Sequence, residues 1–127
     1  MAIQRERKEQ EILVRWFKMK YPGILIVASA NGGRRNIREA ANMKREGVLA
    51  GFPDLQIFAN RQGHYCLLIE LKATPIKGRP KGKVSMNQKV VMNTLNMGGY
   101  YTRIAWGLLE AKKLIDWYMK ENVVYEE

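Results

Sequence analysis

The stretch Cys66–Leu71, CLLIEL, constrains the fold more than any other part of the sequence. Within the strand expected over His64–Lys72, apolar residues occupy both alternating faces. A strand that is apolar on both faces lies inside a sheet that is covered on both sides. We therefore expect a central strand here, with helices packed above and below it.

Other segments supply the neighbours of this strand. Ile12, Leu13, Trp16 and Phe17 recur at helical spacing within residues 4–20, and Tyr21-Pro22-Gly23 ends that helix. The sequence predicts further elements in chain order: a buried strand over 24–29, a short helix over 36–46, a strand over 54–59, helices over 85–97 and 108–120, and a strand over 100–106 between them. The expected order is α-β-(α)-β-β-α-β-α, with the short helix in parentheses. Residues 1–127 are expected to form a single α/β domain with a central mixed sheet flanked by helices.

The formal net charge of +10, from 22 Lys and Arg against 12 Asp and Glu, favours a polyanionic partner. No run approaches the roughly 18 apolar residues that a membrane span needs, so we expect no membrane association. Cys66 is the single cysteine, which excludes an internal disulfide and a cysteine-based zinc site. These features favour a cytoplasmic protein that binds nucleic acid.

Asp54 and the pair Glu70 and Lys72 are the candidate chemical groups. Side chains alternate along a strand, so Glu70 and Lys72 share a face, roughly 7 Å apart. If the strands over 54–59 and 64–72 form a hairpin, Asp54 meets them at one edge. Two carboxylates can hold Mg²⁺ or Mn²⁺, the Leu71 carbonyl can add an oxygen ligand, and a lysine can orient water or balance charge. Phosphodiester hydrolysis needs this set of groups.

A purely structural interpretation competes with this one. Glu-x-Lys occurs by chance in many strands, and Asp54 is able to cap a turn. Pro53-Asp54 ahead of a hairpin that ends in Glu70-Leu71-Lys72 is a more specific pattern. Burial of a charged Glu and Lys in an apolar strand is also costly unless they face a wet cleft, so we favour the catalytic interpretation.

The pattern Pro-Asp … Glu-x-Lys resembles the PD-(D/E)xK nuclease superfamily, and within it the VRR-NUC family in its compact stand-alone form common in bacteriophages. The resemblance covers almost the whole chain through NGGRR (31–35), KREGVLAGFPDL (44–55), LLIELKA (67–73), GKVSMNQ (82–88) and GGYY (98–101).

This resemblance implies a restriction-endonuclease-like core. It also implies that Asp54 and Glu70 are metal ligands, that Lys72 is the catalytic lysine and that Gln88 contributes. Such members are similar to Holliday junction resolvases, which implies a homodimer acting on branched DNA in the cytoplasm of a bacterial or phage-infected host cell.

Two positions keep alternatives open. The superfamily often has a glutamate on the first helix as a further metal ligand, and the matching position here is Gln10. Glu6 lies one turn earlier, and Glu9 and Glu11 flank Gln10, so each remains a candidate. Ser85-Met86-Asn87-Gln88 is also a capping box, which accounts for Gln88 without catalysis.

Two basic segments border the expected cleft. We expect them to contact the DNA backbone and to confer salt sensitivity without sequence specificity. The alternative is a solvated charge run. The residues concerned are Arg34, Arg35 and Arg38 in the first segment and Lys77, Arg79, Lys81 and Lys83 in the loop over 73–84.

His64, the lone histidine, is expected to be structural, and Trp16, Trp106 and Trp117 are expected to lie in the core, with Trp117 also a candidate for a subunit interface. The sequence thus predicts a metal-dependent endodeoxyribonuclease for branched DNA such as four-way junctions. A DNA-binding module without catalysis and a nuclease for flap or linear DNA are the alternatives.

Overall fold

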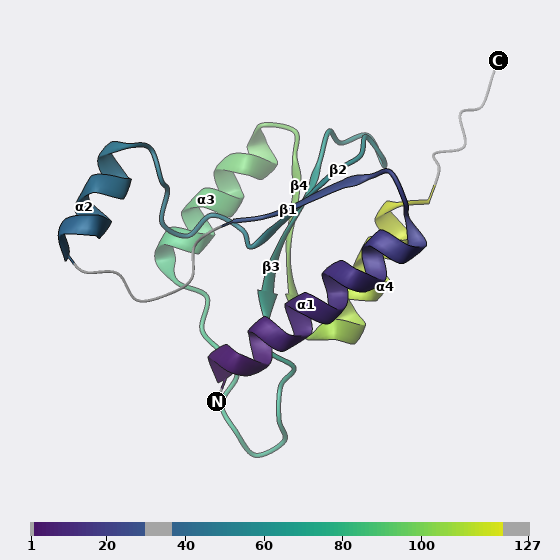
Figure 1. Ribbon diagram of the computed structural model, residues 1–127, viewed down its shortest axis with the longest axis horizontal. Helices are drawn as coiled ribbons and strands as arrows, with labels where there is room; N and C mark the ends of the chain where they lie inside the picture. Colours follow the sequence, from purple (N-terminus) through teal and green to yellow (C-terminus); the bar gives the residue numbers. More distant parts are fainter. Residues whose placement is uncertain (1, 30–36, 121–127) are drawn as a thin grey trace.

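The computed structural model describes residues 2–29 and 37–120, and within them a four-stranded sheet surrounded by helices (Figure 1). The elements are α1 (Ala2–Lys20), β1 (Leu25–Ala28), α2 (Ile37–Arg45), β2 (Leu55–Phe58), β3 (Leu67–Lys72), α3 (Met86–Met97), β4 (Tyr101–Trp106) and α4 (Leu108–Tyr118). Their order confirms the expected succession of helices and strands. The strand expected from His64 begins only at Leu67, because residues 61–64 form a tight turn closed by an Arg61–His64 bridge.

The sheet has the order β1-β2-β3-β4. β1 and β2 are antiparallel, β2 and β3 are antiparallel, and β3 and β4 are parallel. The mixed sheet and the hairpin of β2 with β3 were both expected from the sequence. β3 has neighbours on both sides, and all its residues except Lys72 are buried, which confirms it as a central strand.

The two faces of the sheet are covered by different helices. Leu13 and Phe17, one helical turn apart on α1, pack with Ile115 of α4 against Ile57 and Ile69 on one face. Because side chains alternate, Glu70 points to the other face, and there it meets Gln88 of α3. Helices α1 and α4 therefore cover one face, and α3 lies on the other.

The expectation that the first strand is buried was wrong. β1 is an edge strand, and the side chains of Leu25 and Val27 are 60% and 38% exposed. Phe58, the partner of Leu25 on β2, is 50% exposed. α3 packs mainly against β4, so it leaves this half of the face uncovered. An apolar run identifies the strand but does not specify whether a helix covers it.

The short helix expected after the first strand is present as α2. It has no buried residue and projects from the body of the molecule (Figure 1). Gly47, with a φ of 100°, follows the helix, in agreement with the expected end there. Among the described residues, no helix is long and apolar enough to cross a membrane.

Candidate active site

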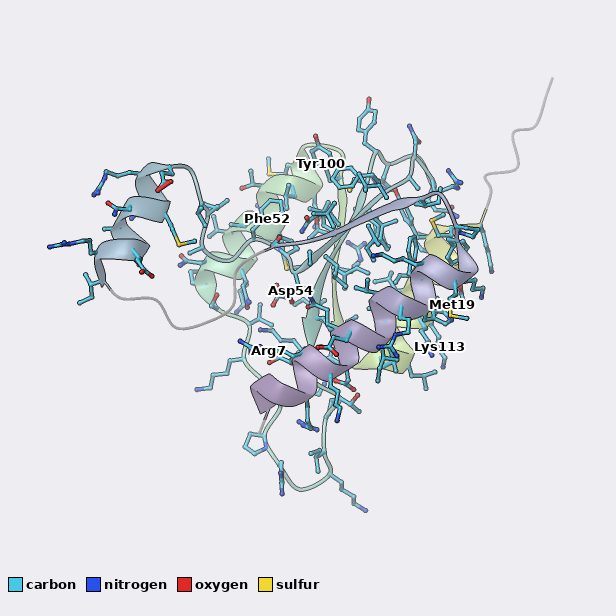
Figure 2. The ribbon with its side chains drawn as sticks, in the orientation of Figure 1. Arg7, Met19, Phe52, Asp54, Tyr100 and Lys113 are labelled. Carbon is cyan, nitrogen blue, oxygen red and sulfur yellow. The ribbon has the colours of Figure 1, made fainter. Side chains whose placement is uncertain are left out.

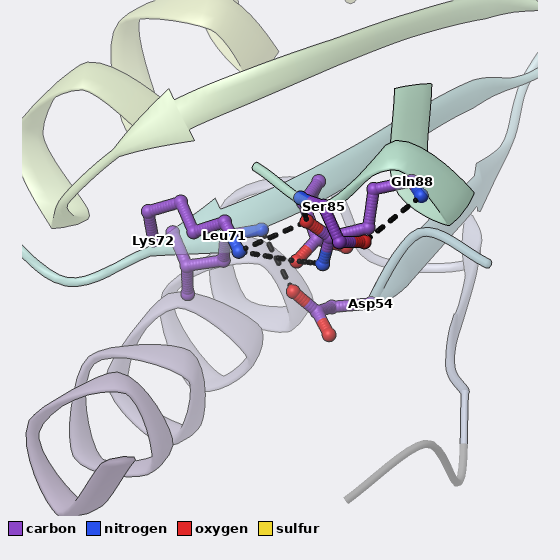
Figure 3. Close-up of polar contacts among 6 residues, drawn as sticks. Asp54, Leu71, Lys72, Ser85 and Gln88 are labelled. Atoms are coloured by element: carbon purple, nitrogen blue, oxygen red, sulfur yellow. Dashed lines mark hydrogen bonds and ion pairs between the residues drawn. The ribbon is translucent and has the colours of Figure 1, made fainter. Parts of the chain in front are cut away.

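Two carboxylates meet where β2 begins and β3 ends. Asp54 immediately precedes β2 (Figure 2), and its Oδ2 accepts a hydrogen bond of 2.8 Å from the backbone N–H of Leu71 (Figure 3). This bond places Asp54 beside Glu70, and the two carboxyl groups are close enough to share a hydrogen bond. The antiparallel hairpin thus brings together two acids that are 16 positions apart in the sequence, as its alternation predicted.

The environment of this pair disfavours negative charge. The pKa of the Glu70 carboxyl is raised to about 8, first by burial and second by the negative charge of Asp54, while Lys72 acts in the opposite direction. Burial also raises the pKa of Asp54, against the lowering effect of the Leu71 N–H bond. The two acids are partly desolvated and adjacent, so they repel each other when both are ionised. A cation bound between them would reduce this repulsion.

Lys72 and Gln88 complete the cluster. The Lys72 ammonium nitrogen lies 3.5 Å from Oε2 of Glu70 and donates a hydrogen bond of 3.2 Å to Oε1 of Gln88. Nε2 of Gln88 in turn donates to Oε2 of Glu70 at 2.9 Å. The three side chains form a closed ring of polar contacts that fixes the Glu70 carboxylate.

Gln88 also has the structural role that the sequence suggested. Ser85 caps α3: the Gln88 N–H donates to its hydroxyl at 3.1 Å, and the Ser85 N–H donates to Oε1 of Gln88 at 2.9 Å. The capping box and the contact with the acidic pair therefore coexist. One amide side chain both begins the helix and supports Glu70 and Lys72.

Asp54, Glu70 and Gln88 line a cleft of about 680 Å³ that is open to solvent. Glu6 and Gln10 of α1, four residues apart and thus on one helical face, both line it. The pKa of Glu6 is raised, chiefly by burial, and Glu6 senses the charges of Lys72 and Asp54. Among the first-helix candidates, these two remain.

Glu9 and Glu11 do not reach the cleft. The Glu9 carboxylate accepts hydrogen bonds from the backbone N–H and the hydroxyl of Thr74. Glu11 is exposed. Helical spacing alone did not separate these four positions, because the side of α1 that faces the cleft depends on how the helix packs on the sheet.

Ser29 and Gln56 support Asp54 and were missed at the sequence level. Ser29 Oγ and Gln56 Nε2 each donate to the carbonyl oxygen of Pro53 at 2.8 Å, and the Ser29 N–H donates to the carbonyl oxygen of Asp54. Together they fix the backbone that presents the acid. The available signal was Gln56 itself, a polar residue inside the apolar strand LQIF.

Gly51 permits close packing at the edge of the cleft. Its φ is 84°, and a Cβ at this position would lie 2.8 Å from the backbone carbon of Asn87 and from the backbone nitrogen of Gln88. The segment before β2 therefore packs directly against the first turn of α3, and no larger residue fits.

The donor set available to a metal ion is small. Within residues 2–29 and 37–120, no group of three or more His, Cys, Asp or Glu side chains is arranged to hold a metal. An ion at this site would therefore rest on Asp54 and Glu70, completed by neutral oxygens such as the Leu71 carbonyl, the Gln10 amide and water. Oxygen ligands of this kind suit Mg²⁺ and Mn²⁺.

The basic residues expected to contact DNA are only partly described. Arg34 and Arg35 lie outside the described residues. The other five are exposed: Arg38 on the projecting helix α2, and Lys77, Arg79, Lys81 and Lys83 in the segment after β3. Their solvent exposure is compatible with contact to a polyanion and with a solvated charge run, so their role stays a prediction.

His64 lies away from the cleft. Its Nδ1 is 3.2 Å from the Gly99 carbonyl oxygen, and its ring packs against Tyr101. The expectation that the tryptophans are core residues holds only in part: Trp16 is partly buried and packs against the core, whereas Trp106 is partly exposed and Trp117 is 40% exposed. Lysine side chains lie over the rings of Trp16 and Trp106, so these rings use their amphipathic character at the surface.

Comparison with known proteins agrees with the fold. A model of the VRR-NUC domain matches residues 4–107. A solved structure described as a VRR_NUC domain protein superposes with a TM-score of 0.74 and 27% sequence identity, over 97% of each chain. No curated protein matches the sequence.

Proposed function

Because this chain belongs to the VRR-NUC family, whose domain has a nuclease-type fold, we propose that it is a metal-dependent endonuclease that hydrolyses phosphodiester bonds in DNA. The observation that carries the proposal is the cluster of Asp54, Glu70 and Lys72, in which the two acids line one open cleft and the Lys72 ammonium nitrogen lies 3.5 Å from Glu70. The high positive charge of the chain supports a nucleic acid substrate.

In this proposal Asp54 and Glu70 hold the cation, with the Leu71 carbonyl and either Gln10 or Glu6 as further candidate ligands. A bound Mg²⁺ or Mn²⁺ would supply charge neutralisation at the phosphate and a lower pKa for water. The Leu71 N–H bond orients Asp54, and Gln88 orients Glu70, so both carboxylates are fixed before substrate binds.

Lys72 has the remaining chemical role. Its ammonium group lies 3.5 Å from Glu70 and donates a hydrogen bond to Gln88, and these contacts hold it beside the acidic pair. We propose that it orients the attacking water or balances the negative charge that develops on the phosphate. Gln88 is then a positioning residue, because it acts through Glu70 and Lys72.

A cleavage assay with Mg²⁺ or Mn²⁺ tests this function on four-way junction, flap, single-stranded and linear duplex DNA. Lys72→Ala should lower the rate by roughly a thousandfold or more, which corresponds to ~4 kcal/mol, while it leaves DNA binding largely intact. Lys113→Ala, on the exposed surface of α4, is the control and should cut like the unmodified protein.

The assay also separates the alternatives. DNA binding without cleavage in the presence of any of these metals would indicate a non-catalytic DNA-binding module. Preference for flap or linear DNA over junctions would indicate another substrate. Equal cleavage by the Lys72→Ala variant and the unmodified protein would show that the site assignment is wrong.

We further propose that the preferred substrate is branched DNA, such as a four-way junction, and that two copies form a dimer that cuts matching strands. We expect the protein to act where such DNA lies, in the cytoplasm of a bacterial or phage-infected host cell. The exposed apolar side chains of Leu25, Val27 and Phe58 support a buried subunit contact on this half of the sheet.

Sedimentation analysis tests the dimer. Phe58→Glu should shift a dimer toward monomer because it places a charge in the contact, whereas Leu109→Glu, an equally drastic change at an exposed position on α4, should not. A monomeric unmodified protein at micromolar concentration would contradict the dimer without affecting the nuclease assignment.

The loop over 73–84 is proposed to contact the DNA backbone. Neutralising Lys77, Arg79, Lys81 and Lys83 together should weaken binding and reduce the dependence of affinity on salt concentration. An unchanged salt dependence would show that these side chains do not contact phosphate.

A further inference from the structure

A second cleft lies next to the acidic one. It has a volume of about 610 Å³ and lies between the N-terminal part of α1 and the segment that leaves β3, which Figure 1 shows as a loop below that helix. Five of its lining side chains are cationic and one is acidic: Arg5, Lys72, Arg79, Lys81, Lys83 and Glu6. Lys77, in the same segment, does not line it.

The base of this cleft is held by contacts between distant parts of the chain. Thr74 begins the segment, and its carbonyl oxygen accepts a hydrogen bond of 3.1 Å from Nη1 of Arg5. Its N–H and hydroxyl donate to the Glu9 carboxylate. On its other side lies Gly107, where a Cβ would overlap the Thr74 side chain. The start of this segment, at Thr74, is therefore held against α1 and against Gly107, the residue before α4.

The far wall of the cleft also packs on the sheet. Lys72 and Trp106 are register partners at the ends of β3 and β4. A Cβ at Gly82 would lie 3.8 Å from the Trp106 ring and 3.9 Å from the Lys72 side chain. The Lys81 ammonium lies 5.0 Å from the centre of the Trp106 ring. These contacts anchor Lys81 and Gly82 over the ends of β3 and β4, which favours a defined position for this part of the segment over a freely solvated charge run.

The two clefts adjoin each other. Glu6 lines both of them. Lys72 lines the cationic cleft, while its ammonium nitrogen lies 3.5 Å from the Glu70 carboxylate that lines the acidic one. A strand with one phosphate at Asp54 and Glu70 would therefore carry a neighbouring phosphate toward Arg79 and Lys81.

We propose that the cationic cleft is a binding subsite for a second phosphate group of the strand that is cut, distinct from the phosphate that is hydrolysed. The inference rests on the proposed nuclease function. Guanidinium and ammonium groups form charge-assisted hydrogen bonds with phosphate oxygens, and a partly enclosed cleft screens these contacts less than open solvent does. The subsite would fix the register of the strand relative to the acidic pair.

A double-mutant cycle between protein and DNA tests this subsite. Binding is measured in Ca²⁺ for a set of duplexes, each with one neutral methylphosphonate linkage at a successive position along one strand. Arg79→Gln and Lys81→Gln should each lower affinity roughly tenfold for unmodified DNA. For the one duplex whose neutral linkage falls in the subsite, the same variants should lose little further affinity, because the phosphate group that they contact is already neutral.

Lys113→Gln is the matched control, because it removes one positive charge from the exposed surface of α4, outside both clefts. It should change binding to every duplex by the same small factor and show no coupling to any linkage. Absence of coupling for Arg79→Gln and Lys81→Gln, or equal coupling for Lys113→Gln, would overturn the subsite. Binding is measured without cleavage, so the two proposals can fail separately. A protein that does not cut DNA would refute the proposed function, whereas the coupling between side chain and linkage would still test the subsite.

Discussion

The polar groups at the two ends of β3 differ in how well they are paired. At its N-terminal end lies an aromatic cluster of His64, Tyr101, Trp117 and Tyr118, in which neighbouring rings pack together. The Tyr118 hydroxyl donates to the carbonyl oxygen of Ala59 at 2.7 Å. At its C-terminal end, two carboxylates lie side by side and the pKa of each is raised.

This difference separates stability from function. The aromatic cluster pairs donors with acceptors and stabilises the fold. The acidic pair brings together groups that repel each other when both are ionised, a conflict that a folded protein retains where function requires it. Substitutions at the two ends should therefore have opposite consequences for folding and catalysis.

The largest expected effect is on cleavage. Asp54→Asn should lower the rate by roughly a thousandfold, or ~4 kcal/mol, because the amide is a poor ligand for a hard cation. Above pH 8, where both acids are ionised, the same variant should stabilise the metal-free protein by ~1 kcal/mol, since the amide oxygen can still accept the Leu71 N–H bond while the repulsion with Glu70 disappears. Cleavage kinetics and urea denaturation measure the two changes. A loss of stability would show that the two acids do not conflict.

The next effect is a pH dependence of stability. The folded protein holds a proton on Glu70 up to a pH of about 8, whereas the unfolded chain releases it near 4.5. The contribution of Glu70 to the stability of the metal-free protein should therefore be greatest below pH 4.5. As the pH rises toward 8, the free energy of unfolding should fall by up to ~1.4 kcal/mol per pH unit.

Urea denaturation in the presence of a chelator, from pH 4.5 to 8.5, measures this slope. Glu70→Gln is the control, because it removes the group with the pKa of about 8 and should reduce the slope, while Asp54 and Glu6, whose pKa values are also raised, still contribute. An unchanged slope in Glu70→Gln would assign the effect to another group.

At the aromatic end, Tyr118→Phe should cost ~1–2 kcal/mol of unfolding free energy, because it leaves a buried carbonyl group without its hydroxyl donor. The maximal cleavage rate should stay unchanged, because Tyr118 lies at the far end of the strand from the acids. Denaturation and cleavage assays on the same preparation would compare the two. A large catalytic defect in a fully folded variant would contradict the separation of the two ends.

The smallest effect is expected at His64. His64→Gln should destabilise the protein by less than ~1 kcal/mol through the lost ring contact with Tyr101, and the cleavage rate should be unaltered. A rate that falls with this substitution would give the histidine a role in the chemistry that its position does not suggest.

The sequence predicted those parts of the molecule that depend on local pattern. The alternation in CLLIELK and the hairpin before it brought Asp54, Glu70 and Lys72 to one edge of the sheet, and the structure brings these three side chains into one cluster. Ser85 and Gln88 form the capping box that their spacing predicted. The catalytic roles of these residues stay predictions.

What the sequence did not predict depends on packing between elements. The apolar run of β1 did not reveal that α3 leaves half of one face of the sheet uncovered. Helical spacing did not choose among the polar residues of α1, because the rotation of that helix is set by Leu13 and Phe17 against the sheet. The contacts of Thr74 with α1 and with Gly107 link residues far apart in the chain, and no local pattern announces them.

The tight fit of Gly51 against α3 has a consequence for how this scaffold can change. The region before it includes α2, which buries none of its side chains, whereas from Gly51 onward the chain is locked to the helix that carries Gln88. The segment from Ile37 to Ala50 is therefore little constrained by the body of the molecule, and Gly51 is its fixed downstream boundary. Changes in the length or composition of that segment should leave Gln88 and the two acids where they are.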